Sequence, residues 1–234
     1  MGWKTQTMLV RPCAFVDEPA KLLSDLGYAS PVKLEETEWA DAGAGSIWIG
    51  TVGDCLVLYT ALAWGFFEDQ IDQKSRDFNA ALVRRFPEAE IAALTLHSVV
   101  GGWGFAVWRQ GSLIRHQHGY DGMVLRDEGA RLPAEETYLA SLARREVEGV
   151  TLYRHPGYPE ADDMTHADLG EPLVFEIVRA FTGYPLDQLN HVRGTNFWLS
   201  EDERQQNWQA QRAARAGVSS PRDRGIRPWW KFWS

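Results

Sequence analysis

The sequence predicts an α+β protein with one mostly antiparallel sheet, helices packed on one face of it and a helical C-terminal region. Strand-like runs are joined by turn-forming pairs such as Gly53-Asp54 and Gln110-Gly111. Most of these runs alternate between apolar and polar residues, whereas 55–60 is nearly continuous in apolar residues and is expected to be a central strand covered on both faces. Runs with helical spacing of apolar residues separate these strand groups, which gives the order β-α-β-β, then α-β-β-β, then helices. A chain of 234 residues is long enough to bury a substantial core.

The N-terminal third predicts strands and two helices. Pro19 fits the first turn of a helix and Gly27 fits its end, because glycine tolerates the left-handed conformation that often follows a helix. The polar, glycine-rich residues 29–45 are expected to form a loop. The expected elements are a strand at 5–10, a helix at 18–26, strands at 46–52 and 55–60, and a helix from Ser75 to Arg85.

The stretch from Ile91 to Tyr120 predicts three consecutive antiparallel strands. The pairs Gly101-Gly102 and Gln110-Gly111 fit two-residue hairpin turns, and such turns fix the register of the strands. Side chains alternate along a strand, so one face becomes a core face and the other a mostly polar face. The expected core face carries Leu94, Leu96, Val100, Trp103, Phe105, Val107 and Ile114, with His116 and His118 opposite Phe105 and Trp103, whereas Arg115 and Gln117 lie on the polar face.

The remaining chain predicts helices joined by polar connections. Residues 119–129 read as a charged loop, 134–148 as an amphipathic helix, 150–154 as a short edge strand and 155–170 as an acidic connection. A helix at 171–182 presents Val174, Ile177, Val178 and Phe181 as its buried stripe. We expect a globular α+β domain at 1–199, a surface or projecting helix at 200–217 and a flexible tail at 218–234.

The charge distribution disfavours some classes of partner. The net charge of the chain is −8, and residues 218–234 carry +3, so the remainder carries −11. An acidic body disfavours binding of nucleic acid and permits a basic partner. The longest uncharged apolar stretch, 55–67, is shorter than the roughly 20 residues of a membrane helix, so we expect a soluble, cytoplasmic protein with no transmembrane segment. Cys13 and Cys55 show no metal-type spacing and are expected to be reduced.

Two groups of polar residues could carry chemistry. His116 and His118 are two residues apart, so both imidazoles can reach one metal ion, but the sequence offers no clear third ligand. Asp162, Asp163, His166 and Asp168 form an acidic cluster without the spacing of a calcium loop, and helix capping and solvation explain it. We therefore predict no metal, no cofactor and no catalytic residue.

The C-terminal tail is the strongest functional signal in the sequence. A linker-like segment is followed by aromatic residues around a lysine, and large aromatics often dominate the energy of protein interfaces. The expected anchor consists of Trp229, Trp230, Lys231, Phe232 and Trp233. This segment could bind another protein, fold back on its own body or a second copy of the chain, or lie at a membrane interface.

These features favour a non-catalytic, protein-binding module with an acidic body and an aromatic docking tail. An inhibitor or immunity-type protein that neutralises a basic effector is one form of this function. The alternative is an enzyme or small-ligand binder with a pocket beside the 91–120 meander. Its expected lining residues are Trp64, Phe66, Trp103, Arg109, His116 and His118.

Overall fold

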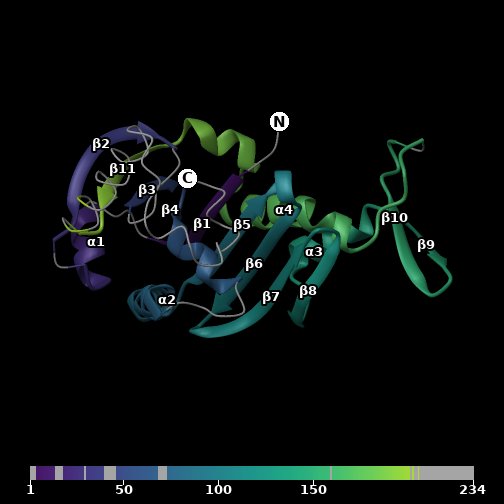
Figure 1. The fold of residues 1–234 in the computed structure, drawn as a ribbon, viewed down its shortest axis with the longest axis horizontal. Helices are drawn as coiled ribbons and strands as arrows, with labels where there is room; N and C mark the ends of the chain where they lie inside the picture. Colours follow the sequence, from purple (N-terminus) through teal and green to yellow (C-terminus); the bar gives the residue numbers. More distant parts are fainter. Residues whose placement is uncertain are drawn as a thin grey trace, which may run out of the picture.

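The fold is built on one large antiparallel sheet. The computed structural model describes residues 4–13, 18–28, 30–39, 46–67, 73–158, 160–200, 202 and 205, and of Glu35, Trp64 and Phe66 it describes the backbone alone. Within these residues, nine strands form one sheet in the order β2-β11-β3-β4-β1-β5-β6-β7-β8, and two more strands, β9 and β10, form a separate hairpin (Figure 1). The predicted α+β class with a mostly antiparallel sheet is confirmed.

The strands of the large sheet are all antiparallel to their neighbours. Their bounds are β1 (Lys4–Arg11), β2 (Val32–Glu38), β3 (Ser46–Val52), β4 (Cys55–Thr60), β5 (Glu90–His97), β6 (Gly102–Arg109), β7 (Ser112–Tyr120), β8 (Met123–Gly129) and β11 (Arg193–Trp198). The predicted strands at 5–10, 46–52 and 55–60 are therefore confirmed. β11 joins the sheet between β2 and β3, far from its neighbours in sequence.

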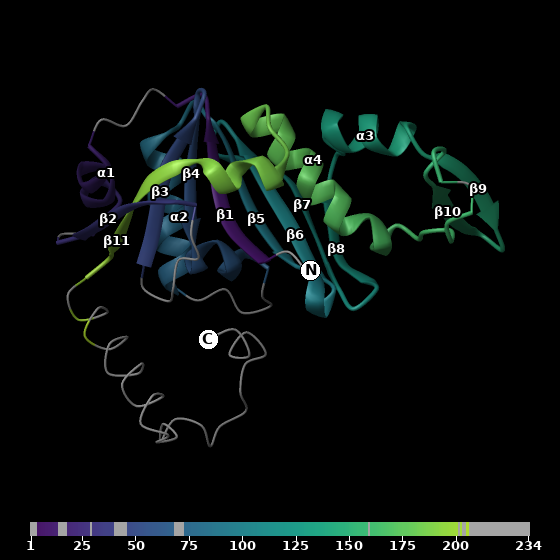
Figure 2. The same ribbon diagram turned by 90° about the horizontal axis from the view of Figure 1, so that it is seen from above.

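Helices cover both faces of the sheet, and not one face as predicted (Figure 2). We call the side packed by α1 (Pro19–Asp25), α2 (Gln73–Arg85) and the 3-10 helix η1 (Ala61–Phe66) the α2 face. The side packed by α3 (Pro133–Ala140), α4 (Gly170–Thr182) and the 3-10 helix η4 (Leu186–His191) is the α4 face. Two faces are needed because the central strands β1, β4 and β5 are apolar on both sides.

The helix α4 confirms its predicted stripe. Its residues Val174, Ile177, Val178 and Phe181 are all buried in the core on the α4 face, and Gly183 ends the helix in the left-handed conformation. Two further 3-10 helices, η2 (Ser98–Val100) and η3 (Ala167–Leu169), lie in connections. The predicted helix at 200–217 lies outside the described residues, apart from Ser200 and the helical Asp202 and Gln205.

The turn between β5 and β6 is longer than predicted. Residues of η2 stand between the strands, so Leu96 pairs with Trp103 and Leu94 with Phe105. The predicted register placed Leu96 opposite Val107 and is therefore wrong by four residues. Because four is an even number, the side chains of β5 and β6 still lie on their predicted faces, and the predicted turn at Gln110-Gly111 is confirmed.

Three predicted segments differ from the structure. Residues 32–38 and 123–129, expected in loops, form the two edge strands β2 and β8, because each finds a partner strand that a local pattern does not reveal. The predicted helix 134–148 ends as α3 at Ala140. The residues that follow form the strand β9 (Ala143–Val147), which pairs with β10 (Val150–Arg154) across a turn in which Glu148 and Gly149 both have positive φ.

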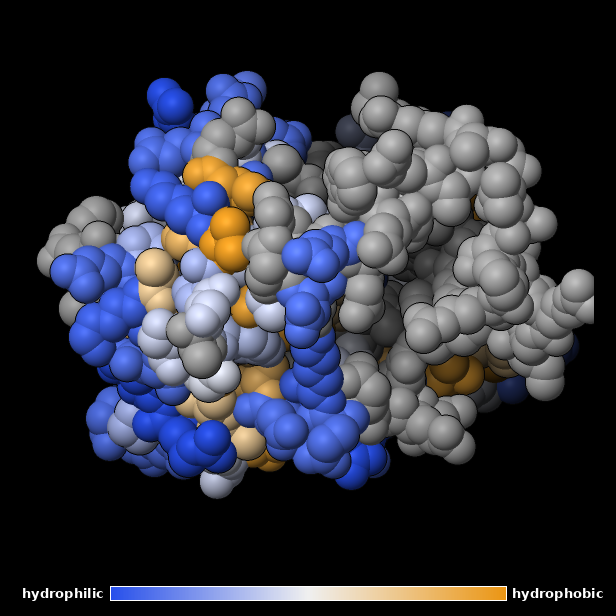
Figure 3. Space-filling view, turned by 60° about the vertical axis from the view of Figure 1, so that its left-hand side comes forward, coloured by the Kyte–Doolittle hydropathy of each residue, from blue (hydrophilic) through white to orange (hydrophobic). Residues whose placement is uncertain are grey.

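The β9–β10 hairpin projects from one end of the molecule, beyond the edge strand β8 (Figures 1 and 2). The described surface at the opposite end is mostly hydrophilic, with small, separate hydrophobic patches (Figure 3). Among the described helices, none has the length and apolar character needed to cross a membrane.

Candidate functional site

A β-bulge in β7 determines which side chains of this strand lie on each face. Val107 pairs with Arg115, but the next residue, Trp108, pairs with Leu113, so Ile114 is an extra residue in β7. One extra residue reverses the alternation of side chains for the rest of the strand. The predicted assignment of β7 side chains to the two faces is therefore wrong for the residues after Ile114.

After the bulge, Arg115 and Gln117 stand opposite Val107 and Phe105 and lie on the α4 face. His116 and His118 stand opposite Ala106 and Gly104 and lie on the α2 face, which is the reverse of the prediction. Strand β7 thus presents a different polar group to each side of the sheet. The α4 side holds an ion-pair network, and the α2 side holds a pair of imidazoles.

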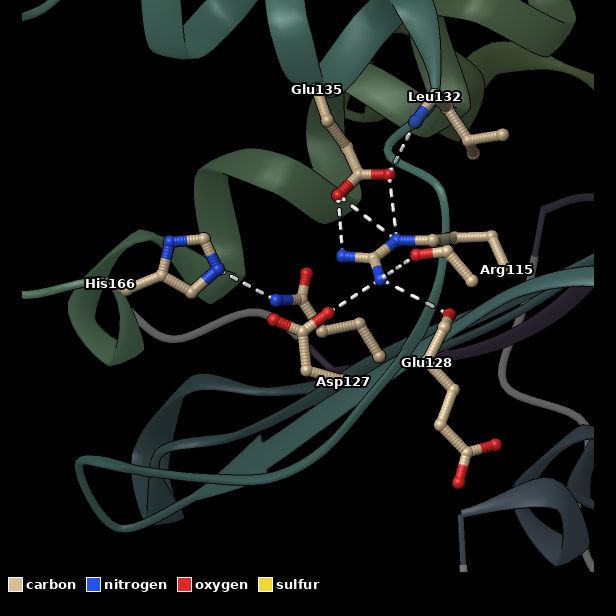
Figure 4. A network of polar contacts seen from close by, with 8 residues as sticks. Arg115, Asp127, Glu128, Leu132, Glu135 and His166 are labelled. Carbon is tan, nitrogen blue, oxygen red and sulfur yellow. Dashed lines mark hydrogen bonds and ion pairs between the residues drawn. The ribbon is translucent and has the colours of Figure 1, made fainter.

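The network on the α4 face is centred on a buried arginine (Figure 4). The Arg115 Nη2 donates to Glu135 Oε1 at 2.8 Å and its Nε donates to Glu135 Oε2 at 3.0 Å, with both side chains 1% exposed or less. Its Nη1 donates to Asp127 Oδ1 at 2.5 Å and to the carbonyl oxygens of Glu128 and Gly129. Burial opposes the charge of Arg115, but its bonds to Glu135 and Asp127 raise the pKa of the guanidinium.

Glu135 connects this network to the start of α3. Its Oε2 accepts a hydrogen bond of 2.8 Å from the backbone N–H of Leu132, which is the residue that precedes the helix. One carboxylate therefore caps α3 and neutralises the arginine of β7. This contact fixes the helix on the outer strands of the sheet.

A histidine from a distant connection completes the group. The Nε2 atoms of Gln117 and His166 are 2.7 Å apart, and burial together with nearby Arg131 lowers the pKa of His166. The neutral imidazole can therefore accept the hydrogen bond that the Gln117 amide donates. The Oε1 of Gln117 is buried and has no hydrogen-bond partner among the described residues. Arg115, Gln117 and Glu135 are buried, whereas Asp127 at the edge strand is exposed. We interpret the set as a brace between β7, α3 and the start of α4.

The histidine pair lies on the opposite face, beneath Phe67. His116 Nε2 and His118 Nδ1 are 3.3 Å apart, and the Phe67 ring meets both imidazoles edge-on. Burial lowers the pKa of His116 to about 4, and the positive charge of Arg126 contributes in the same direction. At neutral pH this imidazole is therefore uncharged, so the pair can share one hydrogen bond between Nε2 and Nδ1, and a metal ion could replace the proton of that bond.

The other predicted pocket residues do not join the histidine pair. Trp103 lies on the α4 face, where it packs directly against Gly170 at the start of α4. Arg109 ends β6 at the surface and forms an ion pair with Glu90 at 2.6 Å. Trp64 and Phe66 belong to η1, but their side chains lie outside the described part of the structure. The tail anchor at 229–233 also lies outside it.

The acidic cluster at 162–168 is divided among separate contacts. Asp163 forms ion pairs with Arg145 and Arg154, the second at 2.8 Å. Asp168 accepts hydrogen bonds from the backbone N–H and the hydroxyl of Thr165, whereas His166 contacts Gln117. In the described part of the chain, no three His, Cys, Asp or Glu side chains are placed to hold a metal ion together.

Both cysteines are buried, and neither forms a disulfide in the described part of the chain. Burial raises the pKa of Cys55 to about 12 and also raises that of Cys13. The reactive thiolate form is therefore scarce at neutral pH.

The β9–β10 hairpin is a candidate binding surface that the sequence prediction missed. At its tip Val147 pairs with Val150, and their side chains are 40% and 51% exposed. The base is fixed by two backbone hydrogen bonds of 2.8 Å between Tyr153 and Met164 and by the ion pairs of Asp163. The pair Glu148-Gly149, followed by the β-forming run 150–154, is the signal that could have revealed this hairpin.

Residues 20–159 match a protein family described as a family of unknown function, DUF6928. The match covers more than half of the chain. The chain belongs to the DUF6928 family. The matched segment extends from α1 to the connection after β10, so it includes the histidine pair, the Arg115–Glu135 ion pair and the strands of the projecting hairpin, but not His166. No curated protein and no solved structure matches the chain.

Proposed function

We propose that this DUF6928 protein is a non-catalytic, protein-binding module and that the β9–β10 hairpin is its main contact element. The observation that carries the proposal is the exposed valine pair at the tip of a projecting hairpin. A two-stranded hairpin on its own is marginally stable in water. The β9–β10 hairpin, which we call the arm, would therefore gain stability when a partner covers it.

The chemistry of the arm supports a protein partner. All five residues of β9 are exposed, and the strand presents Arg144, Arg145 and Glu146 near the apolar tip. An apolar centre with a charged rim is typical of a protein–protein contact. The ion pairs of Asp163 hold the base of the hairpin in place, which reduces the entropy lost on binding.

The acidic body and the aromatic tail are further parts of the same proposal. The charge of −11 outside residues 218–234 favours a basic partner, as an inhibitor or immunity-type protein would have. Trp229, Trp230 and Trp233 would add a second anchor on the same chain, which increases the effective concentration of the partner near the arm.

The test compares the capture of binding partners by four forms of the protein. These are the unchanged chain, a chain ending at Ser220, the arm variant Val147→Asp/Val150→Asp, and the control Val99→Asp. Val99 is exposed in η2, so its substitution makes one of the two Val→Asp changes at a different exposed place. We expect the control to keep the affinity of the unchanged chain. The arm variant should lose affinity for the captured partner about tenfold or more, which is about 1.4 kcal/mol or more.

The outcomes separate the arm from the tail. Equal affinity of the arm variant and the control would contradict a contact through the arm. Loss of capture by the form ending at Ser220 alone would assign binding to the tail. Circular dichroism of each variant shows whether its body remains folded.

The histidine pair supports a second candidate function, a binder of a small ligand or metal ion. Two nitrogen atoms bound to one tetrahedral zinc ion at about 2.0–2.1 Å are about 3.3–3.4 Å apart. The observed distance between His116 Nε2 and His118 Nδ1 is 3.3 Å. Water would have to fill the other positions, because no third described ligand joins the pair.

Titration of the protein with Co²⁺, followed by visible absorption and calorimetry, tests this candidate. Binding that is lost in His118→Asn and kept in His155→Asn would support it, since His155 is exposed and lies in a separate connection. The absence of binding in the unchanged protein, or equal binding by both variants, would exclude the pair as a metal site.

A further inference from the structure

The strand β8 ends the large sheet on the side where the β9–β10 hairpin projects (Figures 1 and 2). One edge of β8 pairs with β7, and the backbone groups of its other edge have no neighbouring strand in the described sheet. Met123 and Leu125 on β8 are 56% and 58% exposed, and Leu113 on β7 is also exposed. An edge strand with exposed apolar side chains is a surface that another strand can extend.

The charged side chains of β8 determine which charges a strand must carry to pair with β8. Arg126 and Glu128 are two residues apart, so both side chains lie on the α2 face, where their ion pair measures 2.7 Å. Both side chains remain partly exposed to solvent. A strand that pairs with β8 must therefore place a negative charge opposite Arg126 and a positive charge opposite Glu128.

We propose that β8 pairs with β8 of a second copy of the chain, in an antiparallel two-fold register centred on Asp127. In this register, Arg126 of each copy faces Glu128 of the other, which creates a square of alternating charges on the α2 face. The proposal extends the proposed function, because it names a second copy as one partner of this end of the molecule. A two-fold contact uses the same surface on both chains, so a self-complementary strand is sufficient to form it.

Neighbouring two-fold registers are disfavoured by the same charges. Centring the pair on Arg126 would place two guanidinium groups opposite each other, and centring it on Glu128 would place two carboxylates opposite each other. Like charges directly opposite each other destabilise a strand pair. The charge pattern therefore favours one register among those that keep each side chain on its own face.

The other side of β8 also fits a register centred on Asp127. In this register the Asp127 residues of the two copies lie opposite each other, but each carboxylate forms an ion pair of 2.5 Å with Arg115 of its own chain. The exposed Leu125 is the extra residue of a bulge between Val124 and Arg126, so it stands at the end of the paired segment, next to the second copy. The pairing would thus cover exposed apolar surface of both chains.

Mass measurement by light scattering during size-exclusion chromatography tests the pairing. We expect the full chain to have twice its single-chain mass of 26.5 kDa. The variants Arg126→Glu and Glu128→Arg should each be monomeric, because each places like charges opposite one another. The double variant Arg126→Glu/Glu128→Arg should return to a dimer, since it restores an alternating square with the signs exchanged.

An equimolar mixture of the two single variants provides an independent check. One variant then carries two negative charges on the α2 face of β8 and the other carries two positive charges, so we expect a heterodimer at low salt. A chain that is monomeric at its highest soluble concentration, or a dimer that persists in Arg126→Glu, would overturn the proposal. Either result leaves the arm contact intact, because the arm is tested separately with Val147→Asp/Val150→Asp.

Pairing of β8 with an extended segment of a different protein would also be visible. In that case the isolated chain would be monomeric, and Leu125→Pro would weaken capture of that protein. That result would likewise overturn pairing between two copies.

Discussion

Arg115 of β7 and Glu135 of α3 form a bidentate ion pair, and neither side chain is more than 1% exposed. The pair joins the outer part of the sheet to the helix that precedes the projecting hairpin. Buried charges of this kind are costly to separate, because a lone charge would remain in a medium that solvates it poorly.

Glu135→Gln should therefore destabilise the fold strongly. Removing the carboxylate leaves the buried positive charge of Arg115 without its main counter-charge, and it weakens the hydrogen bond that caps α3 at Leu132. We expect the free energy of unfolding in urea to fall by about 3–5 kcal/mol. Glu136→Gln is the matched control, because Glu136 is the exposed neighbour on the same helix, and it should change the free energy by no more than about 0.5 kcal/mol. Similar effects of the two variants would contradict a structural role for the pair.

His116 should make the protein less stable in acid. Its pKa in the folded protein is about 4, below the value of about 6.5 in an unfolded chain, because the ring is buried near Arg126. Between these values the unfolded chain binds a proton that the folded protein does not. Stability is therefore fully retained above pH 6.5 and falls as the pH decreases towards 4, by an amount on the order of 3 kcal/mol.

Urea titrations at several pH values measure this dependence. His116→Gln should lose less stability than the unchanged chain between pH 6.5 and 4. His191→Gln, at an exposed side chain, should behave like the unchanged chain. His97 and His166 also have lowered pKa values, so part of the acid dependence should remain in His116→Gln. An identical pH dependence in both variants would refute the role of His116.

Gly170→Ala should disturb the packing of α4 on the sheet. A methyl group at this position would overlap the indole of Trp103, and Gly170 itself is buried. We expect a loss of about 1–3 kcal/mol in the free energy of unfolding. In a Trp103→Leu background, Gly170→Ala should cost little, because the overlapping atoms are gone. Additive effects of the two changes would show that the indole is not the reason for glycine.

Asp163→Asn should loosen the β9–β10 hairpin and leave the body intact. The substitution weakens the ion pairs with Arg145 and Arg154 that hold the base of the arm. We expect faster hydrogen exchange at the amide of Tyr153, with a change in global stability within about 1 kcal/mol. Asp162→Asn, at the exposed neighbouring position, should leave exchange unchanged. If the amides of the arm were equally protected from hydrogen exchange in Asp163→Asn and Asp162→Asn, backbone pairing alone would hold the arm in place.

The sequence predicted local elements well wherever a strong turn or stop signal was present. Gly53-Asp54 and Gln110-Gly111 marked real hairpins, and Gly183 marked the real end of α4. The buried stripe of α4 followed from its spacing of apolar residues. Turns, helix ends and apolar stripes depend on the types of a few neighbouring residues, and these can be read directly from the sequence.

The candidate site was less accessible to sequence reasoning. Arg115 and Gln117 were placed on the polar face because a regular strand was assumed, but the extra residue Ile114 exchanges the two faces. The partner of Arg115 is Glu135 on α3, and that of Gln117 is His166, from the connection before α4. No local pattern indicates either contact, since both require helices packed over the sheet.

The sequence by itself determined the α+β class, the main hairpins and the apolar stripe of α4, because local turn chemistry and periodicity fix these features. Only the tertiary structure decided that helices cover both faces, that residues 32–38 and 123–129 become edge strands, and that 143–154 leaves the body as a hairpin. An edge strand exists only when a neighbour offers hydrogen bonds, and a bulge shows only when two strands are aligned. Such properties belong to pairs of distant segments, and the fold alone brings these segments together.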